Sequence, residues 1–526
     1  YIPGKFNRDR EKLFFFFSEE YWPVRLNRPL YQLTVPTELE RRGDFSQSVE
    51  LNGARIPVVD PTTRQPVPGN IIPASRVDPN GTALLKVFPL PNFTDISVSA
   101  RRYNWVAQDI NNEPRRAESL RLDYNASPRD PIFFSYTHRY EEQTGATGVA
   151  TSGSTNWSQM RKTFFGDGKL YVGRYTRIFS PTLVNELNVS FVHRPQGDSA
   201  EDSEIKKNQR STIGFTAGQF NPKANPLDII PNATFGGVTN AANLFVEQRF
   251  PHSAMTNNIS ITNNLTKIWR SHNFKAGFFM IHDRPERKLY AVFNGSFTFA
   301  RNVNNPLETG FAYSNAAFGV FNSYTEASDS VYRRYRMNTV EWFFQDNWKV
   351  SRKLTFDLGL RMCYLPNYYD AENKLSVFDP ARFDPAKAVR LIRPATIGGR
   401  RVGVHPVTGQ EYPAVFIGAI APGVGDVNNG MASPLTEPSY PRGLVENRRP
   451  WLAPRFGFAY DLAGNGKTAI RGGFGLFYNR EALESSANPF AIQRPIIENP
   501  VINYGTLSTL LSSQGFLFPE NVQGID

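Results

Sequence analysis

The chain has 526 residues, 40% of them hydrophobic, and a formal net charge of +11. Its mean hydropathy of −0.41 and its lack of any apolar run of about 18 residues exclude a helical membrane protein. Lysine and arginine are dispersed without a block of like charges, so we expect no nucleic-acid partner, and the single cysteine, Cys363, excludes an internal disulfide framework.

The first predicted strand covers residues 12–21 and contains four consecutive phenylalanines. A long polar and proline-rich stretch follows, at about residues 22–118. Inside it, Asp78 and Pro79 are suited to the N-cap and first position of a short helix, which Pro89 would end.

The later strands occur as five hairpins in which apolar and polar side chains alternate. They cover residues 120–140, 164–191, 258–280, 341–362 and 455–479. In the fourth hairpin, Leu354 to Met362 alternate without a break, whereas Phe343 and Asp346 depart from the pattern. Nine strand residues span roughly 30 Å, and a tilt of about 40° would give ~23 Å, close to the ~25 Å apolar band of an outer-membrane barrel. A soluble β-sandwich would show the same alternation.

The connections favour the barrel over the sandwich. Turns of about three to six residues alternate with long loops, a pattern that is rare in compact soluble domains and normal in outer-membrane barrels. The long loops cover about residues 22–118, 195–256, 283–339 and 365–452. We therefore predict an all-β fold, a partial antiparallel transmembrane β-barrel over residues 1–526 with long extracellular loops.

Several segments are similar in sequence to those of one protein family. Residues 342–350 read WFFQDNWKV and residues 354–361 read LTFDLGLR, while residues 43–46 read GDFS and residues 69–76 read GNIIPASR. With these and similar segments the chain resembles TonB-dependent outer-membrane receptors, and more narrowly their Oar-like branch.

The resemblance implies energised uptake across the outer membrane of a Gram-negative bacterium. In that family a regulatory-like domain and a plug domain precede a barrel of about 22 strands. This sequence opens at Tyr1 without a signal-peptide pattern and holds about eleven convincing strands, with no plug or TonB box, so we interpret it as a piece of a longer protein. The implied partners are outer-membrane lipid, the parent's plug domain, the TonB complex and an extracellular ligand of unknown identity.

The two parities of the strands supply the candidate site residues. We expect charged residues of the polar parity to face the lumen and to pair across strands, as an alternative to a catalytic carboxylate set. These candidates are Arg121, Asp123, Asp357, Arg361, Arg455, Asp461 and Arg471.

The apolar parity supplies candidates for contact with lipid or for an interfacial aromatic girdle. They are Trp342, Phe344, Trp348, Leu354, Phe356, Leu358, Leu360, Phe456, Phe458 and Tyr460. Trp342 and Trp348 stand near the two ends of their predicted strand, as girdle residues or as packed aromatics.

The sequence contains no motif that indicates a catalytic, metal-binding or phosphate-binding site. The six histidines form no HxH or HxxxH pair, and no glycine-rich phosphate loop stands out. We expect no enzyme activity, catalytic residue, metal or cofactor. Two other interpretations stay open: a secreted or surface β-sandwich for binding or adhesion, and a passive porin-like channel.

Overall fold

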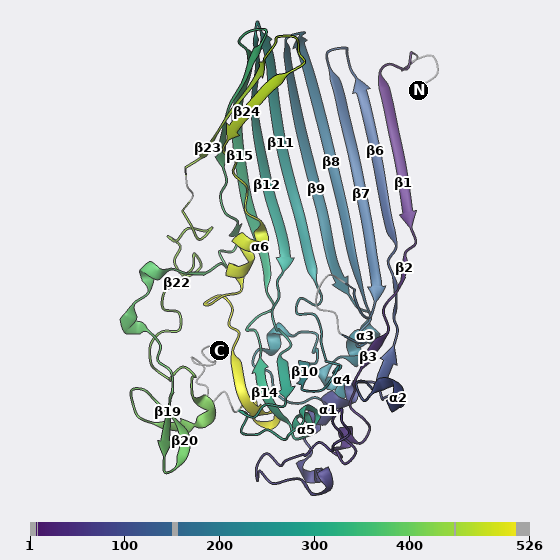
Figure 1. Cartoon of the computed structure of the whole chain (residues 1–526), viewed down its shortest axis with the longest axis vertical. Helices are drawn as coiled ribbons and strands as arrows, with labels where there is room; N and C mark the ends of the chain where they lie inside the picture. Colours follow the sequence, from purple (N-terminus) through teal and green to yellow (C-terminus); the bar gives the residue numbers. More distant parts are fainter. Residues whose placement is uncertain (1–6, 8, 150–155, 447–448, 512–526) are drawn as a thin grey trace.

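The computed structural model describes residues 7, 9–149, 156–446 and 449–511, and a tall wall of antiparallel strands dominates it (Figure 1). Within the described residues, eleven strands follow one another in chain order across this wall. They are β1 (Leu13–Trp22), β6 (Arg115–Asn125), β7 (Pro131–Gly145), β8 (Lys162–Ser180), β9 (Leu183–Ser199), β11 (Ser253–Trp269), β12 (His272–Lys288), β15 (Tyr332–Lys349), β16 (Leu354–Tyr364), β23 (Trp451–Asp461) and β24 (Ala469–Gly475). The predicted antiparallel strands and hairpins are confirmed. The sheet is open, with β1 and β24 at its edges.

Several strands are longer than the sequence pattern indicated. β15 begins at Tyr332, nine residues before the predicted hairpin, and β8 and β9 run to 19 and 17 residues. All the extra length lies at the end of the wall where the long connections emerge, which we call the loop end; the short turns mark the turn end.

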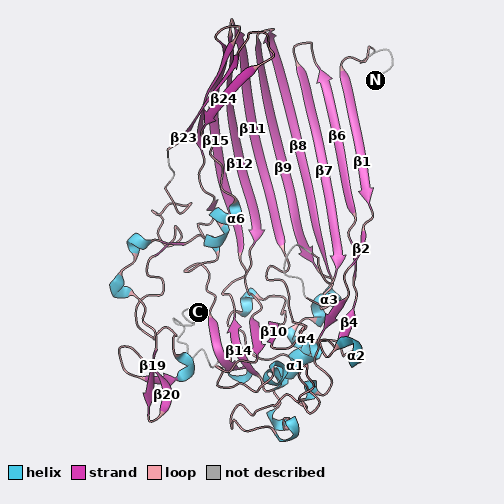
Figure 2. Cartoon of the chain, viewed as in Figure 1, coloured by secondary structure: helices cyan, strands magenta, loops and turns pink. Residues whose placement is uncertain are grey.

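The long connections, which were predicted as loops with one short helix, are folded. Residues 23–114, 200–252, 289–331 and 501–510 pack together below the wall in a layer that we call the cap, where most of the helices lie (Figures 1 and 2). Its centre is a four-stranded sheet of β10 (Asn232–Gly236), β13 (Ser296–Ala300), β14 (Val320–Thr325) and β25 (Val501–Thr506). All four segments contribute to one shared apolar core, and Ala224, Ile229, Val246 and Phe250 form a smaller cluster with Met160 and Phe293.

The predicted helix is present in the cap as α1 (Pro79–Val87). The Asp78 side chain accepts hydrogen bonds from the backbone N–H groups of Asn80 and Gly81, at 2.8 and 2.9 Å. α1 packs against α5 (Ala312–Ala317), and a Cβ on Gly81 would lie 1.7 Å from the carbonyl oxygen of Ala316. This close approach explains why the helix tolerates a glycine.

Buried polar side chains tie distant cap segments together. The Asn80 amide oxygen accepts hydrogen bonds from the backbone N–H groups of Thr216 and Ala217, at 2.6 and 2.8 Å. The Glu326 carboxylate accepts others from Phe220 and Asn221, at 3.0 and 2.5 Å. Burial raises the pKa of Glu326, and these two backbone donors act in the opposite direction because they favour the charged carboxylate.

A second apolar core lies where the chain returns to the wall after β24. Residues 483–497, including α6 (Leu483–Ser486), pack against Tyr335 and Met337 near the loop end of β15. The Arg333 guanidinium donates a hydrogen bond to the carbonyl oxygen of Ala491 at 2.9 Å. No helix in the described ranges is long and apolar enough to cross a membrane.

Leu84→Ala is expected to lower the free energy of unfolding of the cap by about 2–5 kcal/mol, because the Leu84 side chain is fully buried in its core. Urea unfolding followed by tryptophan fluorescence measures this. The control is Ile71→Ala in the same layer, where the side chain is 50% exposed and the expected change is within about 0.5 kcal/mol. Equal losses in the two variants would contradict a packed cap.

Candidate functional site

The register of the wall divides the predicted site residues between its two faces. Directly paired residues of neighbouring strands point to the same side, and the pairs can be followed without interruption from β6 to β24. One face, which we call the polar face, carries all seven charged candidates, Arg121, Asp123, Asp357, Arg361, Arg455, Asp461 and Arg471. The other, the apolar face, carries all ten apolar candidates, Trp342, Phe344, Trp348, Leu354, Phe356, Leu358, Leu360, Phe456, Phe458 and Tyr460.

Of the ion pairs on the polar face, one joins neighbouring strands as predicted and another lies within a single strand. Arg121 binds Asp123 on its own strand, with 2.7 Å between Nε and Oδ2. Arg361 binds Glu341 on the neighbouring strand, at 2.8 Å. Residues two apart on one strand share a face, so Arg121 reaches its partner without crossing to another strand.

The other two carboxylates of the predicted set have different partners. Asp357 accepts a hydrogen bond from the Asn347 side chain at 2.5 Å. The Asp461 carboxylate accepts hydrogen bonds from the backbone N–H groups of Gly464 and Gly466, at 2.9 and 2.8 Å. These bonds stabilise the turn between β23 and β24. The prediction that these residues pair with arginines across strands was therefore wrong.

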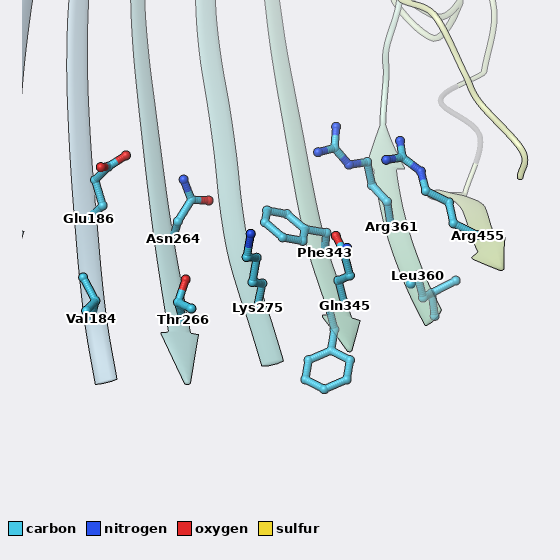
Figure 3. A pocket seen from close by; sticks show the side chains of 12 residues that line it. Val184, Glu186, Asn264, Thr266, Lys275, Phe343, Gln345, Leu360, Arg361 and Arg455 are labelled. Carbon is cyan, nitrogen blue, oxygen red and sulfur yellow. The ribbon is translucent and has the colours of Figure 1, made fainter. Parts of the chain in front are cut away.

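The polar face is hollowed near the turn end of the wall by a pocket of about 430 Å³ (Figure 3). Residues of six successive strands line it: Val184, Glu186, Asn264, Thr266, Lys275, Phe343, Phe344, Gln345, Gly359, Leu360, Arg361 and Arg455. Among them, Phe344 and Leu360 have the parity of the apolar face. On a flat sheet Val184 and Arg455 would stand about 24 Å apart. The pocket therefore extends across the polar face from β9 to β23, and Figure 1 shows that the wall bends toward β23 and β24.

Phe343, the first exception to the alternation, lies in this pocket. A Cβ on Gly277, its direct partner on β12, would lie 2.2 Å from the Phe343 ring, so the ring occupies the space that the glycine leaves. The Arg361 guanidinium lies over the same ring, at 5.5 Å from its centroid. An aromatic residue out of step, paired with a glycine, is the sequence signal for this contact.

Asp346, the second exception, lies on the apolar face close to the turn end. Its carboxylate is 2.7 Å from Nδ1 of His272, and the His272 ring stacks on Phe274 and Trp348, with centroid distances of 5.2 and 5.3 Å. The charge is therefore enclosed by rings. Trp348 stands near a strand end as predicted, but Trp342 lies in mid-strand because β15 starts at Tyr332, so its predicted end position was wrong.

Five polar lining residues were not predicted from the sequence: Glu186, Asn264, Thr266, Lys275 and Gln345. All five have the polar parity of predicted hairpins, which was their available signal. Their convergence depends on the curvature of the wall, which a strand pattern does not give. No group of three or more His, Cys, Asp or Glu among the described residues could hold a metal ion.

A family model described as an outer membrane beta barrel domain matches residues 9–524. The chain belongs to this family of outer-membrane β-barrel domains. Membership places the protein in the outer membrane of a Gram-negative bacterium. No curated protein matches the chain.

Two solved structures are similar to this barrel domain. The outer membrane transporter YddB from Escherichia coli has 10% identity and a TM-score of 0.37, over 75% of this chain and 35% of YddB. BauA, the ferric preacinetobactin receptor from Acinetobacter baumannii, has 9% identity and a TM-score of 0.21, over 70% of this chain and 52% of BauA. The chain thus spans about a third and about half of their lengths.

Gly277→Ala is expected to destabilise the barrel domain by about 1–3 kcal/mol, since the added methyl group displaces the Phe343 ring. The loss should become smaller in a Phe343→Ala background, where only the Asn264 Oδ1 atom, at 2.7 Å, remains close to the added methyl group. Gly173→Ala is the control, because nothing lies within 4 Å of a Cβ there. Urea titration of the folded protein in detergent measures all four variants. A loss of the same size without the ring would contradict the contact between Gly277 and Phe343.

Proposed function

We propose that this chain forms the barrel wall of a TonB-dependent transporter of the Oar-like branch. The transporter takes up a large or scarce ligand and catalyses no reaction. The apolar face contacts lipid and the polar face encloses the pathway. In the full-length protein a plug domain and the TonB complex are the partners. The observation that carries the proposal is the separation of apolar and charged side chains onto two faces of one eleven-stranded wall, together with the family-like segments at residues 43–46, 69–76 and 342–361.

The apolar face supports contact with lipid because no second layer of the described residues covers it. Phe344 on β15, Leu360 on β16 and Phe456 on β23 are 53%, 44% and 46% exposed. Soluble proteins rarely leave an apolar surface of this extent open to water. A β-sandwich would bury these side chains against a second sheet.

A polar network marks the edge of the apolar band at the loop end. His138 lies between Glu118 and Asp167, with ring nitrogen to carboxylate distances of 3.0 and 2.6 Å, and Asp167 also binds Lys169 at 2.7 Å. Tyr124 stands six residues beyond Glu118, about 20 Å farther along the strand. Charges at this margin, with an apolar band of bilayer height beyond them, fit a membrane boundary.

The cap and the segment after β24 favour a gated transporter over a passive channel. The cap lies across the loop end of the wall (Figure 1), and residues 483–497 pack on the polar face there. Both elements stand where an extracellular ligand would enter. The cap is therefore the part of the chain that would meet the ligand first.

Phe344→Arg is expected to weaken folding into lipid bilayers by about 2–4 kcal/mol, because it places a charge in the apolar band. The adjacent Gln345→Arg is the control, since Gln345 lines the pocket on the polar face. Urea titration of refolding into liposomes measures both. Equal penalties would refute the assignment of the two faces.

The full-length protein in liposomes is expected to leave maltose permeation at the level of protein-free vesicles, as judged by osmotic swelling. The reason is that the cap and residues 483–497 occupy the loop end of the wall. A trimeric porin serves as the positive control. Rapid swelling by correctly folded protein would refute the gated transporter and favour the passive channel.

A further inference from the structure

One row of side chains crosses the pocket from strand to strand. Thr266, Lys275, Gln345, Gly359 and Arg455 are successive direct partners on β11, β12, β15, β16 and β23. Gly359 has no side chain, so the row is open between Gln345 and Arg455. In Figure 3 the side chains of Lys275, Arg361 and Arg455 extend toward the same side of the sheet.

Two cations of this row differ from the other basic groups nearby. Arg361 is neutralised by Glu341 at 2.8 Å, and Arg174, farther along the same face, lies 3.8 Å from Glu186. Lys275 has no ion pair or side-chain hydrogen bond with any described residue. Arg455 only covers the ring of Phe477, at 4.6 Å from its centroid, and meets no described carboxylate. The pocket therefore holds two uncompensated positive charges.

We propose that the pocket binds an anionic group, a carboxylate or a phosphate, between Lys275 and Arg455. Guanidinium and ammonium groups bind such anions through charge-assisted hydrogen bonds, and the amide of Gln345 adds a neutral donor. The Phe343 ring lies beside Arg361 in the pocket, and the Phe477 ring lies beside Arg455. The volume of about 430 Å³ is in the range of small-molecule sites.

This inference rests on the proposed function, because the polar face must enclose the interior of the barrel. Two sources can supply the same chemistry: a soluble anion on its way through the barrel, or an acidic side chain of the plug domain. At the loop end the cap and residues 483–497 already cover the wall, so the site lies in the half of the interior that this chain leaves open.

The test is titration calorimetry with two probes, citrate for carboxylates and pyrophosphate for phosphates, on the folded barrel domain in detergent. We expect saturable binding of at least one probe that weakens at high salt. Lys275→Met and Arg455→Met should each weaken it at least tenfold. Arg139→Met is the matched control, because it removes a positive charge from the same face outside the pocket, where Arg139 pairs with Glu141 at 3.7 Å.

Repeating the titration with the full-length protein identifies the source. Binding that disappears in the presence of the plug and returns after its removal shows that the plug supplies the anion, and unchanged binding shows a soluble ligand. Absence of binding to both probes, or binding that survives both substitutions, overturns the proposal. Phe344→Arg tests lipid contact through folding, whereas Lys275→Met and Arg455→Met test anion binding, so failure of the anion site and failure of the barrel assignment give different results.

Discussion

The whole structure depends on one constraint, that backbone polar groups in hydrocarbon need partners within the protein. A wall of antiparallel neighbours meets it, because every interior strand bonds to the strands before and after it in the chain. The backbone then needs no hydrogen bonds from side chains. Successive side chains can therefore be apolar on the face toward lipid and polar on the opposite face. The two faces of the wall, one apolar and exposed, the other charged and hollowed, follow from this.

Departures from the alternation show where local packing overrides it. Phe343 is on the charged face because Gly277 opposite leaves room for its ring, and the ring in turn supports the Arg361 guanidinium. Asp346 is on the apolar face because His272 binds its carboxylate and aromatic rings enclose the pair. Each of the two side chains thus lies on the face opposite to the one expected from its polarity, and a residue on the neighbouring strand stabilises it there.

The parts of the fold that could be predicted from the sequence are the local ones. Period-two alternation predicted the hairpins and the faces of all seventeen candidate residues, and Asp78 with Pro79 predicted α1. The cap could not be predicted, because its contacts join residues far apart, such as Asn80 with Thr216. The partners in the ion pairs could not be predicted for a related reason. An arginine has several carboxylates within reach, and the strand register determines which of them it binds. The pocket needed curvature, which no single hairpin contains.

The direction of the edge strands sets a condition on the complete barrel. β1 starts beside Tyr124 at the turn end and runs to the loop end, and β24 follows the turn after β23 and runs the same way. Two strands that run in the same direction cannot pair antiparallel with each other. In a membrane the free backbone groups of both edges need partners. An antiparallel ring therefore requires an odd number of further strands between β24 and β1, which raises the total from eleven to an even number, as bacterial outer-membrane barrels have. The exposed Phe15 on β1, at 77%, lies at an edge where such a strand would pack.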